Sequence, residues 1–443
     1  WGQTTLPDAV DRSRATIFSG YDTLEDEGVV LYLVSTDDQS MPVLLSEAEA
    51  GAVVTVITDR TPFYAAAGGQ VGDIGSIGTE QARLTVQDTT KTVEGIYFHL
   101  SLVEEGSIRV GEVVKLQVDP PARLDTARNH TTTHLLHKAL KLVVGDHVAQ
   151  AGSAVSPERL RFDFSHFQPL TQAEKQKVEA LVNEEILRND PVVTEIKSIE
   201  QARREGAVAL FDEKYGDTVR VVSVGSFSKE LCGGTHLHLT AEACQFRLIS
   251  ESGIASGIRR IEGVTGSSAW LLAREQDQLL KESAATLRVQ ENELPGRLGQ
   301  LIERIKKLEK ELAEEHKEKL KSTADNLTDQ LVVIGAITTL VTAIQVADIA
   351  QLRAAADRIR DRLDDYMIVL GAAIEGKAAW VAMASDKAVK AGLHAGNLIR
   401  EAARLTGGGG GGKPEMAQAG GKNPDMIPQA LQEIKKHIQE KLC

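Results

Sequence analysis

Two short motifs, far apart in the chain, constrain its fold more than any other feature. His130 and His134 lie four residues apart in "HTTTH", and Cys232 and His236 repeat that spacing in "CGGTH". Residues i and i+4 share one face of a helix, so the two histidines can present their imidazoles to one point. Gly233 and Gly234 allow a tight turn that brings the cysteine and the third histidine together. A fold that uses all four side chains must join these two segments.

The four side chains suit a metal ion. Three imidazoles and one thiolate favour tetrahedral Zn²⁺. The Glu of helical metallopeptidase motifs is absent between His130 and His134, which disfavours a zinc peptidase. A closed four-ligand site is usually structural, so a binding module with a purely structural metal stays open as an alternative. We expect His137 and His238 to be neighbours of the site and not ligands.

Composition limits the class of protein. The chain has 443 residues, three cysteines and a formal net charge of −13. Too few cysteines for a disulfide framework predict a reducing, cytoplasmic setting. No signal sequence and no apolar run of about eighteen residues is present, so we expect a soluble chain that has no membrane partner. Because the chain begins at Trp1, we expect a fragment or a processed product.

Charge is unevenly distributed along the chain. Residues 330–443 hold 14 Lys and Arg against 12 Asp and Glu, so this tail is slightly basic inside an acidic protein. The overall acidity argues against indiscriminate nucleic-acid binding. A local phosphate-binding surface is still allowed in the tail.

The pattern predicts a multidomain protein. Residues 1–118 contain short β-branched runs typical of a small β-barrel, at 28–35, 52–59, 82–90, 95–102 and 113–119. Residues 119–266 combine helical and strand patterns and predict an α+β domain. Residues 329–443 alternate buried-strand runs with helices and predict a small α/β domain.

Residues 267–328 between these domains are rich in Leu, Glu and Lys. An apolar seam steps by 4, 3, 4, 3 and 4 residues, through Leu294, Leu298, Leu301, Ile305, Leu308 and Leu312. Such a seam predicts a coiled coil. A helical hairpin within the chain and a homodimer through the helical or C-terminal region both satisfy it.

Longer motifs carry a family resemblance. The stretches "HTTTHLLHKAL", "HVAQAGSAVSPERLRFDFSH", "GSFSKELCGGTH" and "SGIRRIEGVTG" resemble the editing domain of alanyl-tRNA synthetases. "TPFYAAAGGQVGD" resembles the glycine-rich motif of the barrel that precedes it, and "GGGGGGKPEMAQAGG" resembles a signature of the C-terminal tRNA-binding domain. The resemblance follows the family's order over essentially the whole chain.

This resemblance implies hydrolysis of tRNA(Ala) mischarged with Ser or Gly, at a Zn²⁺ ion held by His130, His134, Cys232 and His236. A pocket built for alanine cannot strongly reject glycine or serine, so a second site must edit. Thr133 and Gln150 match positions that line the editing pocket. Arg259 and Arg260 are candidates for phosphate contacts in the acceptor end, although a role in surface salt bridges is equally open. The aminoacylation core is missing from this sequence, so we expect no tRNA charging.

Two glycine-rich segments have expected roles. Gly68, Gly69 and Gln70 are expected to allow close backbone approach by another segment. The polar residues that the family has before this motif are Ala65, Ala66 and Ala67 here, and Ala151 and Ala154 also depart from the family pattern. A tRNA contact is expected in an ordered loop formed by Gly407, Gly408, Gly409, Gly410, Gly411, Gly412 and Lys413. Composition alone would also allow a flexible linker there.

Overall fold

The computed structural model describes residues 10–36, 41–208 and 216–442, with the side chains of 316–326 excepted. The chain divides into two compact units, Trp1–Glu282 and Ser283–Cys443.

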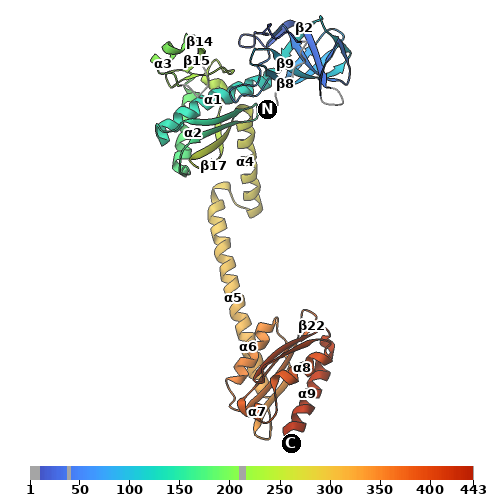
Figure 1. Ribbon diagram of the computed structural model, residues 1–443. Coiled ribbons are helices and arrows are strands. Elements are labelled where there is room, and N and C mark those ends of the chain that lie inside the picture. The colour runs from blue at the N-terminus through green and yellow to red at the C-terminus, as the bar shows by residue number, and fades with distance from the viewer. Residues whose placement is uncertain (1–9, 37–40, 209–215, 443) are drawn as a thin grey trace. The chain divides into compact units, whose positions relative to one another are not determined.

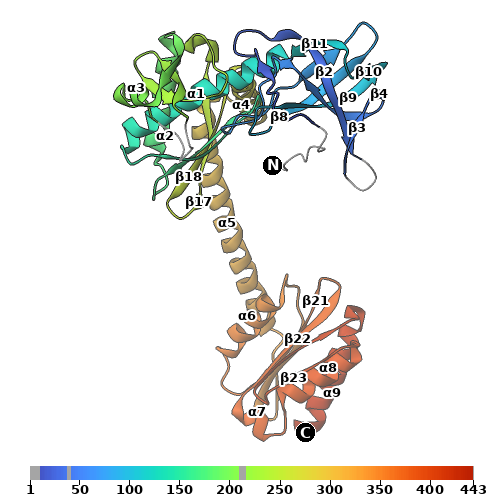
Figure 2. The same ribbon diagram turned by 45° about the horizontal axis from the view of Figure 1, so that its top comes forward.

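The first unit begins with a closed antiparallel barrel (Figure 2). Neighbouring strands run in the order β11, β7, β8, β9, β5 and β2, and β11 pairs with β2 to close the ring. Their bounds are β2 (Glu25–Thr36), β5 (Val53–Thr58), β7 (Gly75–Gly78), β8 (Arg83–Lys91), β9 (Tyr97–Glu105) and β11 (Val113–Val118). Alternate apolar side chains fill the interior, among them the fully buried Leu33, Val56, Leu84 and Leu116.

Shorter strands complete the barrel region. β3 extends the sheet beside β2, and the other four form two small ladders. They are β1 (Ile17–Phe18), β3 (Pro42–Leu45), β4 (Glu47–Glu49), β6 (Arg60–Thr61) and β10 (Ser107–Arg109). All five predicted strands are present. β7 is an additional strand that was not predicted, because its two glycines have a low propensity for strands.

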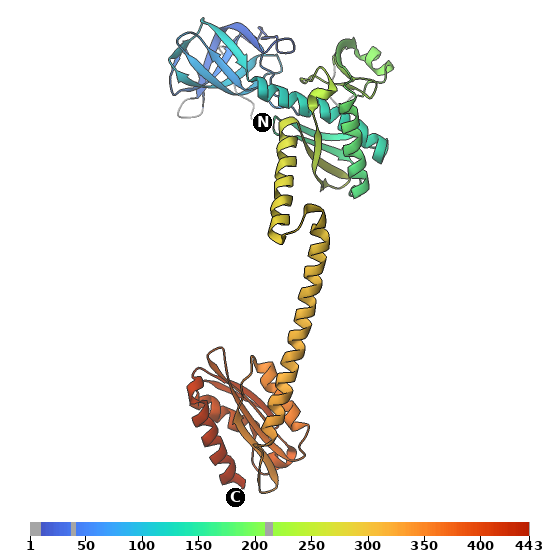
Figure 3. The same ribbon diagram turned by 180° about the vertical axis from the view of Figure 1, so that it is seen from behind.

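Helix α1 (Pro120–Val144) leaves the barrel and runs across the next domain (Figure 3). The Asp119 side chain accepts a hydrogen bond from the Ala122 N–H, and Pro120 opens the helix, which is a favourable N-terminus. Gly145 ends it. Most of α1 between residues 126 and 140 is buried, so the helix is a central element of the fold and both its faces make contacts.

Helices α1 and α2 pack on one face of a four-stranded antiparallel sheet (Figure 1). The sheet order is β12, β13, β18, β17, and Phe162, Phe164 and Ile261 point from it into the shared core. A three-stranded sheet, ordered β14, β15, β16, lies beside them. The bounds are β12 (Gln150–Val155), β13 (Leu160–Ser165), α2 (Gln172–Leu187), β14 (Val192–Ser198), α3 (Ile199–Arg204), β15 (Thr218–Val224), β16 (Ser228–Leu231), η1 (Thr240–Ala243), β17 (Phe246–Ala255), β18 (Ile258–Thr265) and α4 (Gly266–Leu287).

The second unit is a small α/β domain preceded by a long helix. Its mixed sheet runs β19, β20, β21, β22, β24, β23, and only β20 and β21 are parallel. Side chains of β21 alternate between two cores: Met367 and Val369 face α8 and α9, whereas Ile368 and Leu370 face α6. The bounds are η2 (Glu291–Glu293), α5 (Leu294–Thr328), β19 (Val332–Ile334), β20 (Ile337–Ala343), α6 (Ile349–Arg360), β21 (Tyr366–Ile374), β22 (Lys377–Ala384), α7 (Asp386–Lys390), α8 (Ala395–Leu405), β23 (Gly409–Gly412), β24 (Met416–Gly421), η3 (Pro424–Met426) and α9 (Ile427–Leu442).

Four glycines of the tract form a strand, so the expectation of a loop is wrong for Gly409–Gly412. Gly409–Gly412 form the edge strand β23, antiparallel to β24. A Cβ on Gly410 would lie 2.3 Å from the Cβ of Ala419, and one on Gly412 would lie 2.6 Å from the Cα of Ala417. Pairing with β24 orders this part of the tract and excludes a flexible linker there, and at Gly410 and Gly412 the two strands approach too closely for a side chain.

The predicted multidomain fold class is confirmed: a barrel, an α+β domain, helices and a C-terminal α/β domain follow one another. The proposed boundaries fall after β11, after β18 and at the end of α5. The predicted seam lies on α5, where Leu298, Ile305, Leu308 and Leu312 are about half exposed. Pairing through this seam stays a prediction. Within the described residues, no helix is both long and apolar enough to cross a membrane.

Candidate metal centre

The two predicted motifs meet at one point in the first unit. The ligand atoms of His130, His134, Cys232 and His236 all lie within 4.8 Å of one another. The Cys232 Sγ is 3.3 Å from the Nε2 of His130 and 3.3 Å from the Nε2 of His236. His130 and His134 come from successive turns of α1, and their rings are stacked with centroids 5.4 Å apart. Gly234 is required beside them, because a Cβ there would lie 2.1 Å from the His130 Cε1.

Each histidine of the cluster is oriented through its Nδ1. The His130 Nδ1 lies 2.7 Å from the Gln70 Oε1, and the His236 Nδ1 lies 3.1 Å from the Thr131 Oγ1. The His134 Nδ1 contacts a carboxylate oxygen of Glu230. If each Nδ1–H donates to these acceptors, the three Nε2 lone pairs face the centre of the cluster. Such outer partners fix the tautomer of metal-binding histidines.

The cluster fits a Zn²⁺ ion on two further grounds. The His134 Nε2 is buried and has no hydrogen-bond partner, as a ligand atom lacking its metal would be. Burial raises the pKa of the Cys232 thiol, but the positive charge that His130, His236 and His134 carry when protonated outweighs burial and holds this pKa well below its ordinary value. One thiolate and three imidazoles form a donor set typical of zinc.

Glu230 is a further candidate site residue that the sequence pattern did not reveal. Its carboxylate is 3 % exposed and also contacts the His137 Nδ1 at 2.9 Å. Burial alone would raise the pKa of this carboxyl, but the neighbouring imidazoles outweigh burial and lower it. The pairing raises the pKa of His134 in return, against the effect of burial. His137 thus belongs to the surroundings of the cluster, while His238 donates its backbone N–H to Glu242.

The barrel reaches the cluster through its glycine-rich loop. The Gly69 carbonyl accepts a hydrogen bond from the Val155 N–H at 2.8 Å, so the loop docks on the end of β12. Gly69 has a φ of +85°, and a Cβ there would lie 2.6 Å from the Ser153 carbonyl oxygen. Gln70, next in the chain, is buried and accepts from the Thr235 N–H at 2.9 Å while it contacts His130.

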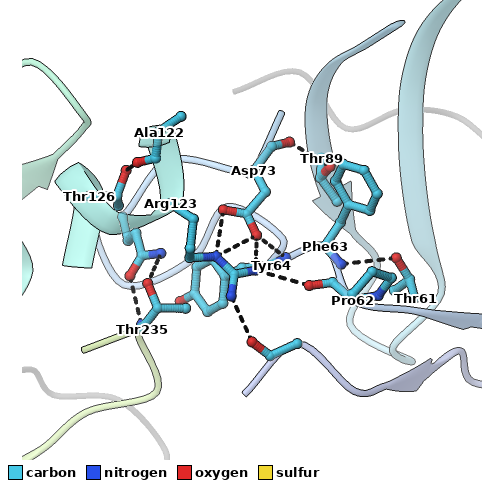
Figure 4. A network of polar contacts seen from close by, with 12 residues as sticks. Thr61, Pro62, Phe63, Tyr64, Asp73, Thr89, Ala122, Arg123, Thr126 and Thr235 are labelled. Carbon is cyan, nitrogen blue, oxygen red and sulfur yellow. Dashed lines mark hydrogen bonds and ion pairs between the residues drawn. The ribbon is translucent and has the colours of Figure 1, made fainter. Parts of the chain in front are cut away.

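A buried ion pair holds the barrel against α1 (Figure 4). The Arg123 guanidinium contacts both carboxylate oxygens of Asp73 and donates to the carbonyls of Gly20 at 2.7 Å and Pro62 at 2.9 Å. The Asp73 carboxylate also accepts from the Tyr64 N–H at 2.6 Å. Barrel and α+β domain therefore share one polar network beside the cluster.

A cavity of about 150 Å³ opens onto the cluster. It is lined by the cluster residues His130, His134 and Cys232, and by Tyr64, Ala67, Gly68, Thr133, Gln150, Ser153 and Glu230. Thr133 and Gln150, which the family resemblance places in the editing pocket, both line this cavity. A larger groove of about 770 Å³ crosses the outside of the barrel but contains no cluster residue. The ligand-bearing side chains converge on the smaller cavity.

The chain is similar to several known proteins. Residues 3–122 match a family model for class II (A) tRNA synthetases, 219–262 match the second additional domain of threonyl- and alanyl-tRNA synthetases, and 336–440 match the DHHA1 domain. The chain is 45 % identical over 443 residues to an alanine–tRNA ligase of Acetivibrio thermocellus, covering 100 % of this chain and 50 % of the relative. Over its whole length the chain is similar to about half of an alanyl-tRNA synthetase.

Other relatives cover the same share. An alanine–tRNA ligase of Alkaliphilus oremlandii is 44 % identical over 433 residues, which is 98 % of this chain and 49 % of the relative. The chain thus spans about half the length of these alanyl-tRNA synthetases. The crystal structure of the C-Ala domain from Aquifex aeolicus alanyl-tRNA synthetase covers 25 % of this chain and 97 % of its own, at 28 % identity and a TM-score of 0.23.

The two arginines that are candidates for phosphate contacts are engaged in ion pairs. Arg260 donates through Nε and Nη2 to Asp163 at 2.7 and 2.8 Å. Arg259 donates through Nε to Glu251 at 2.6 Å. Both lie on β18, and neither lines the cavity. The salt-bridge alternative is therefore what the structure contains, and the phosphate contact stays a prediction.

Proposed function

We propose that this chain hydrolyses the ester bond of tRNA(Ala) mischarged with serine or glycine, at a Zn²⁺ ion bound by His130, His134, Cys232 and His236. The observation that carries the proposal is the convergence of these side chains beside a small cavity that Thr133 and Gln150 also line. The match to the second additional domain covers residues 219–262, which include Cys232 and His236. We place the activity in the cytoplasm, where free cysteines persist.

The metal would supply positive charge that polarises the ester carbonyl or holds the substrate's amino group. The chain's own residues then determine which substrate fits. The Thr133 hydroxyl donates to the Asn129 carbonyl at 2.8 Å, so its oxygen lone pairs remain able to accept a hydrogen bond. A serine hydroxyl satisfies that acceptor, whereas correctly attached alanine leaves it unpaired. Unpaired buried polar groups are costly, and this cost discriminates against alanine.

The second unit is proposed to bind the tRNA. It contains the DHHA1 match, the slightly basic tail and the bare backbone of edge strand β23 next to Lys413. Free N–H groups on an edge strand can donate to phosphate or ribose oxygens, and Lys413 adds charge. Arg259 and Arg260 could contribute in the first unit only if substrate displaces their carboxylate partners. A homodimer through the helical or C-terminal region is part of the same proposal.

Thr133→Val tests the discrimination, because it removes the hydroxyl while keeping the shape of the side chain. Release of serine should slow by about tenfold, the value of one hydrogen bond of about 1–1.5 kcal/mol. Release of alanine, which is slow in the wild type, should become faster, because the acceptor that alanine leaves unpaired is no longer present. Thr132→Val is the matched control: Thr132 is buried one residue earlier on α1, and it does not line the cavity.

The rival function is a tRNA-binding module whose metal is only structural. It predicts that the full chain with metal bound binds tRNA(Ala) but releases neither serine nor glycine above the uncatalysed rate. Equal effects of Thr133→Val and Thr132→Val would instead show that the cavity is not where serine is read.

A further inference from the structure

The turn that carries the thiolate is held at all three of its carbonyl groups. Arg220, on β15, donates through Nη1 to the Cys232 carbonyl at 3.0 Å and to the Gly234 carbonyl at 2.7 Å. Tyr21, in the barrel segment before β2, donates its hydroxyl to the Gly233 carbonyl at 2.6 Å. The Cys232 N–H in turn donates to the Arg220 carbonyl at 3.0 Å. Every peptide of the turn is thus tied to a residue outside it.

Tyr21 and Arg220 also hold each other. The guanidinium carbon of Arg220 lies 4.2 Å from the centroid of the Tyr21 ring, a cation–π contact. The ring edge of Phe18 packs against Tyr21 with centroids 4.9 Å apart, and the Arg220 Nη2 lies 3.3 Å from the Thr194 hydroxyl. Tyr21 and Arg220 therefore join the barrel to the β14–β15–β16 sheet across the Cys232 turn.

The Cys232–Gly234 turn needs these contacts because its own glycines do little to restrict its conformation. Gly233 has no neighbour within 4 Å of where a Cβ would stand, and Gly234 must be glycine because of the His130 ring. Two consecutive glycines leave a segment with high conformational freedom when it is not held. The position of the Cys232 Sγ depends on that segment, and a metal site binds its ion more tightly when its ligands are already held in place.

We infer that Tyr21 and Arg220 are positioning residues for the thiolate ligand, so that the barrel completes the metal centre although it supplies no ligand. The inference rests on the proposed metal site but not on its catalytic role. It predicts that affinity for the metal and the geometry of the sulfur–metal bond depend on a hydroxyl and a guanidinium that never touch the ion.

The test is a titration of the full, metal-stripped chain with Co²⁺, which reports thiolate ligation through its sulfur-to-cobalt absorption band. Tyr21→Phe keeps the ring for Arg220 and removes only the hydroxyl; Arg220→Lys keeps the charge and removes the forked donor. Outer partners of metal ligands typically change affinity by 10–100-fold. We expect the Kd for Co²⁺ to rise about 3–10-fold in Tyr21→Phe and about 10–100-fold in Arg220→Lys, each with a shifted or weakened band.

Tyr32→Phe is the matched control, since the Tyr32 hydroxyl is also on the barrel but accepts from the Asp11 N–H at 3.1 Å. It should bind Co²⁺ like the wild type. If both test variants keep the wild-type Kd for Co²⁺ and the wild-type absorption band, the inference is overturned. This holds even if the metal-free variants melt at lower temperature, because Tyr21 and Arg220 would then only stabilise the fold. If the wild type takes up no Co²⁺, the metal site and the proposed function fall as well. If the wild type and both variants bind equally, only this inference falls.

Discussion

Replacing Arg123 by Met should destabilise the junction between the barrel and α1 more than any surface change. The Arg123 and Asp73 side chains are only 8 % and 4 % exposed, and the guanidinium also satisfies two backbone carbonyls. Arg123→Met leaves a buried carboxylate without its cation and two carbonyls without a donor. Breaking a buried pair by removing one partner costs about 3–5 kcal/mol.

Hydrogen exchange of the full chain, read by peptide, measures this cost where it arises. At about 1.4 kcal/mol per tenfold, amides in β2 and α1 that exchange by opening of the first unit should speed up by roughly two to three and a half powers of ten. Amides in β21 and β22 belong to the second unit and serve as an internal reference.

The matched control is Arg83→Met. Arg83 pairs with Glu104 at 3.3 Å on the same barrel, but the two side chains are 66 % and 36 % exposed. Exposed pairs contribute about 0–1 kcal/mol, so exchange should change less than about fivefold. If Arg123→Met is no worse than Arg83→Met in β2 and α1, the reasoning about the buried pair is refuted.

Three further substitutions test other contacts. Gly69→Ala should lower the melting temperature more than Gly111→Ala. Both glycines have positive φ, but only at Gly69 would a Cβ lie 2.6 Å from a carbonyl oxygen. Equal shifts in melting temperature would mean that strain in φ accounts for the whole effect. Glu230→Gln should weaken zinc binding in chelator competition by about 10–100-fold, since it replaces the charged partner of two imidazoles, and unchanged affinity would remove this carboxylate from the account. Gly410→Ala should raise the KM for aminoacyl-tRNA, because its Cβ would clash with Ala419 on β24 and distort β23. Gly409→Ala, which has no neighbour near its Cβ, should leave the KM unchanged. Equal KM values for the two variants would show that β23 does not take part in tRNA binding.

Local patterns in the sequence predicted the elements and the cluster itself. The i, i+4 spacing correctly implied that His130 and His134 share a helix face, and the Gly-Gly turn correctly implied that Cys232 and His236 could converge with them. The five β-branched runs appear as barrel strands because alternation and bounding turns are local signals.

The contacts that tune the cluster were not predictable in the same way. Gln70 reaches His130 across 60 residues, and Tyr21 reaches Gly233 across 212 residues. Such pairings depend on how the barrel docks on α1, and no periodicity within either segment encodes them. The edge strand β23 was also missed, because glycine is depleted in strands and its backbone pairing here comes from close packing against β24.

Serine release from Ser-tRNA(Ala), measured in the same samples as zinc content, tests the central claim most directly. The account predicts about one Zn²⁺ per chain, loss of deacylation when the metal is stripped, and recovery when one equivalent is returned. Cys232→Ala should lose both zinc and activity, whereas Cys244→Ala should keep both, because Cys244 is exposed and outside the cluster. Wild-type rates of serine release from the metal-free chain or from Cys232→Ala would contradict it.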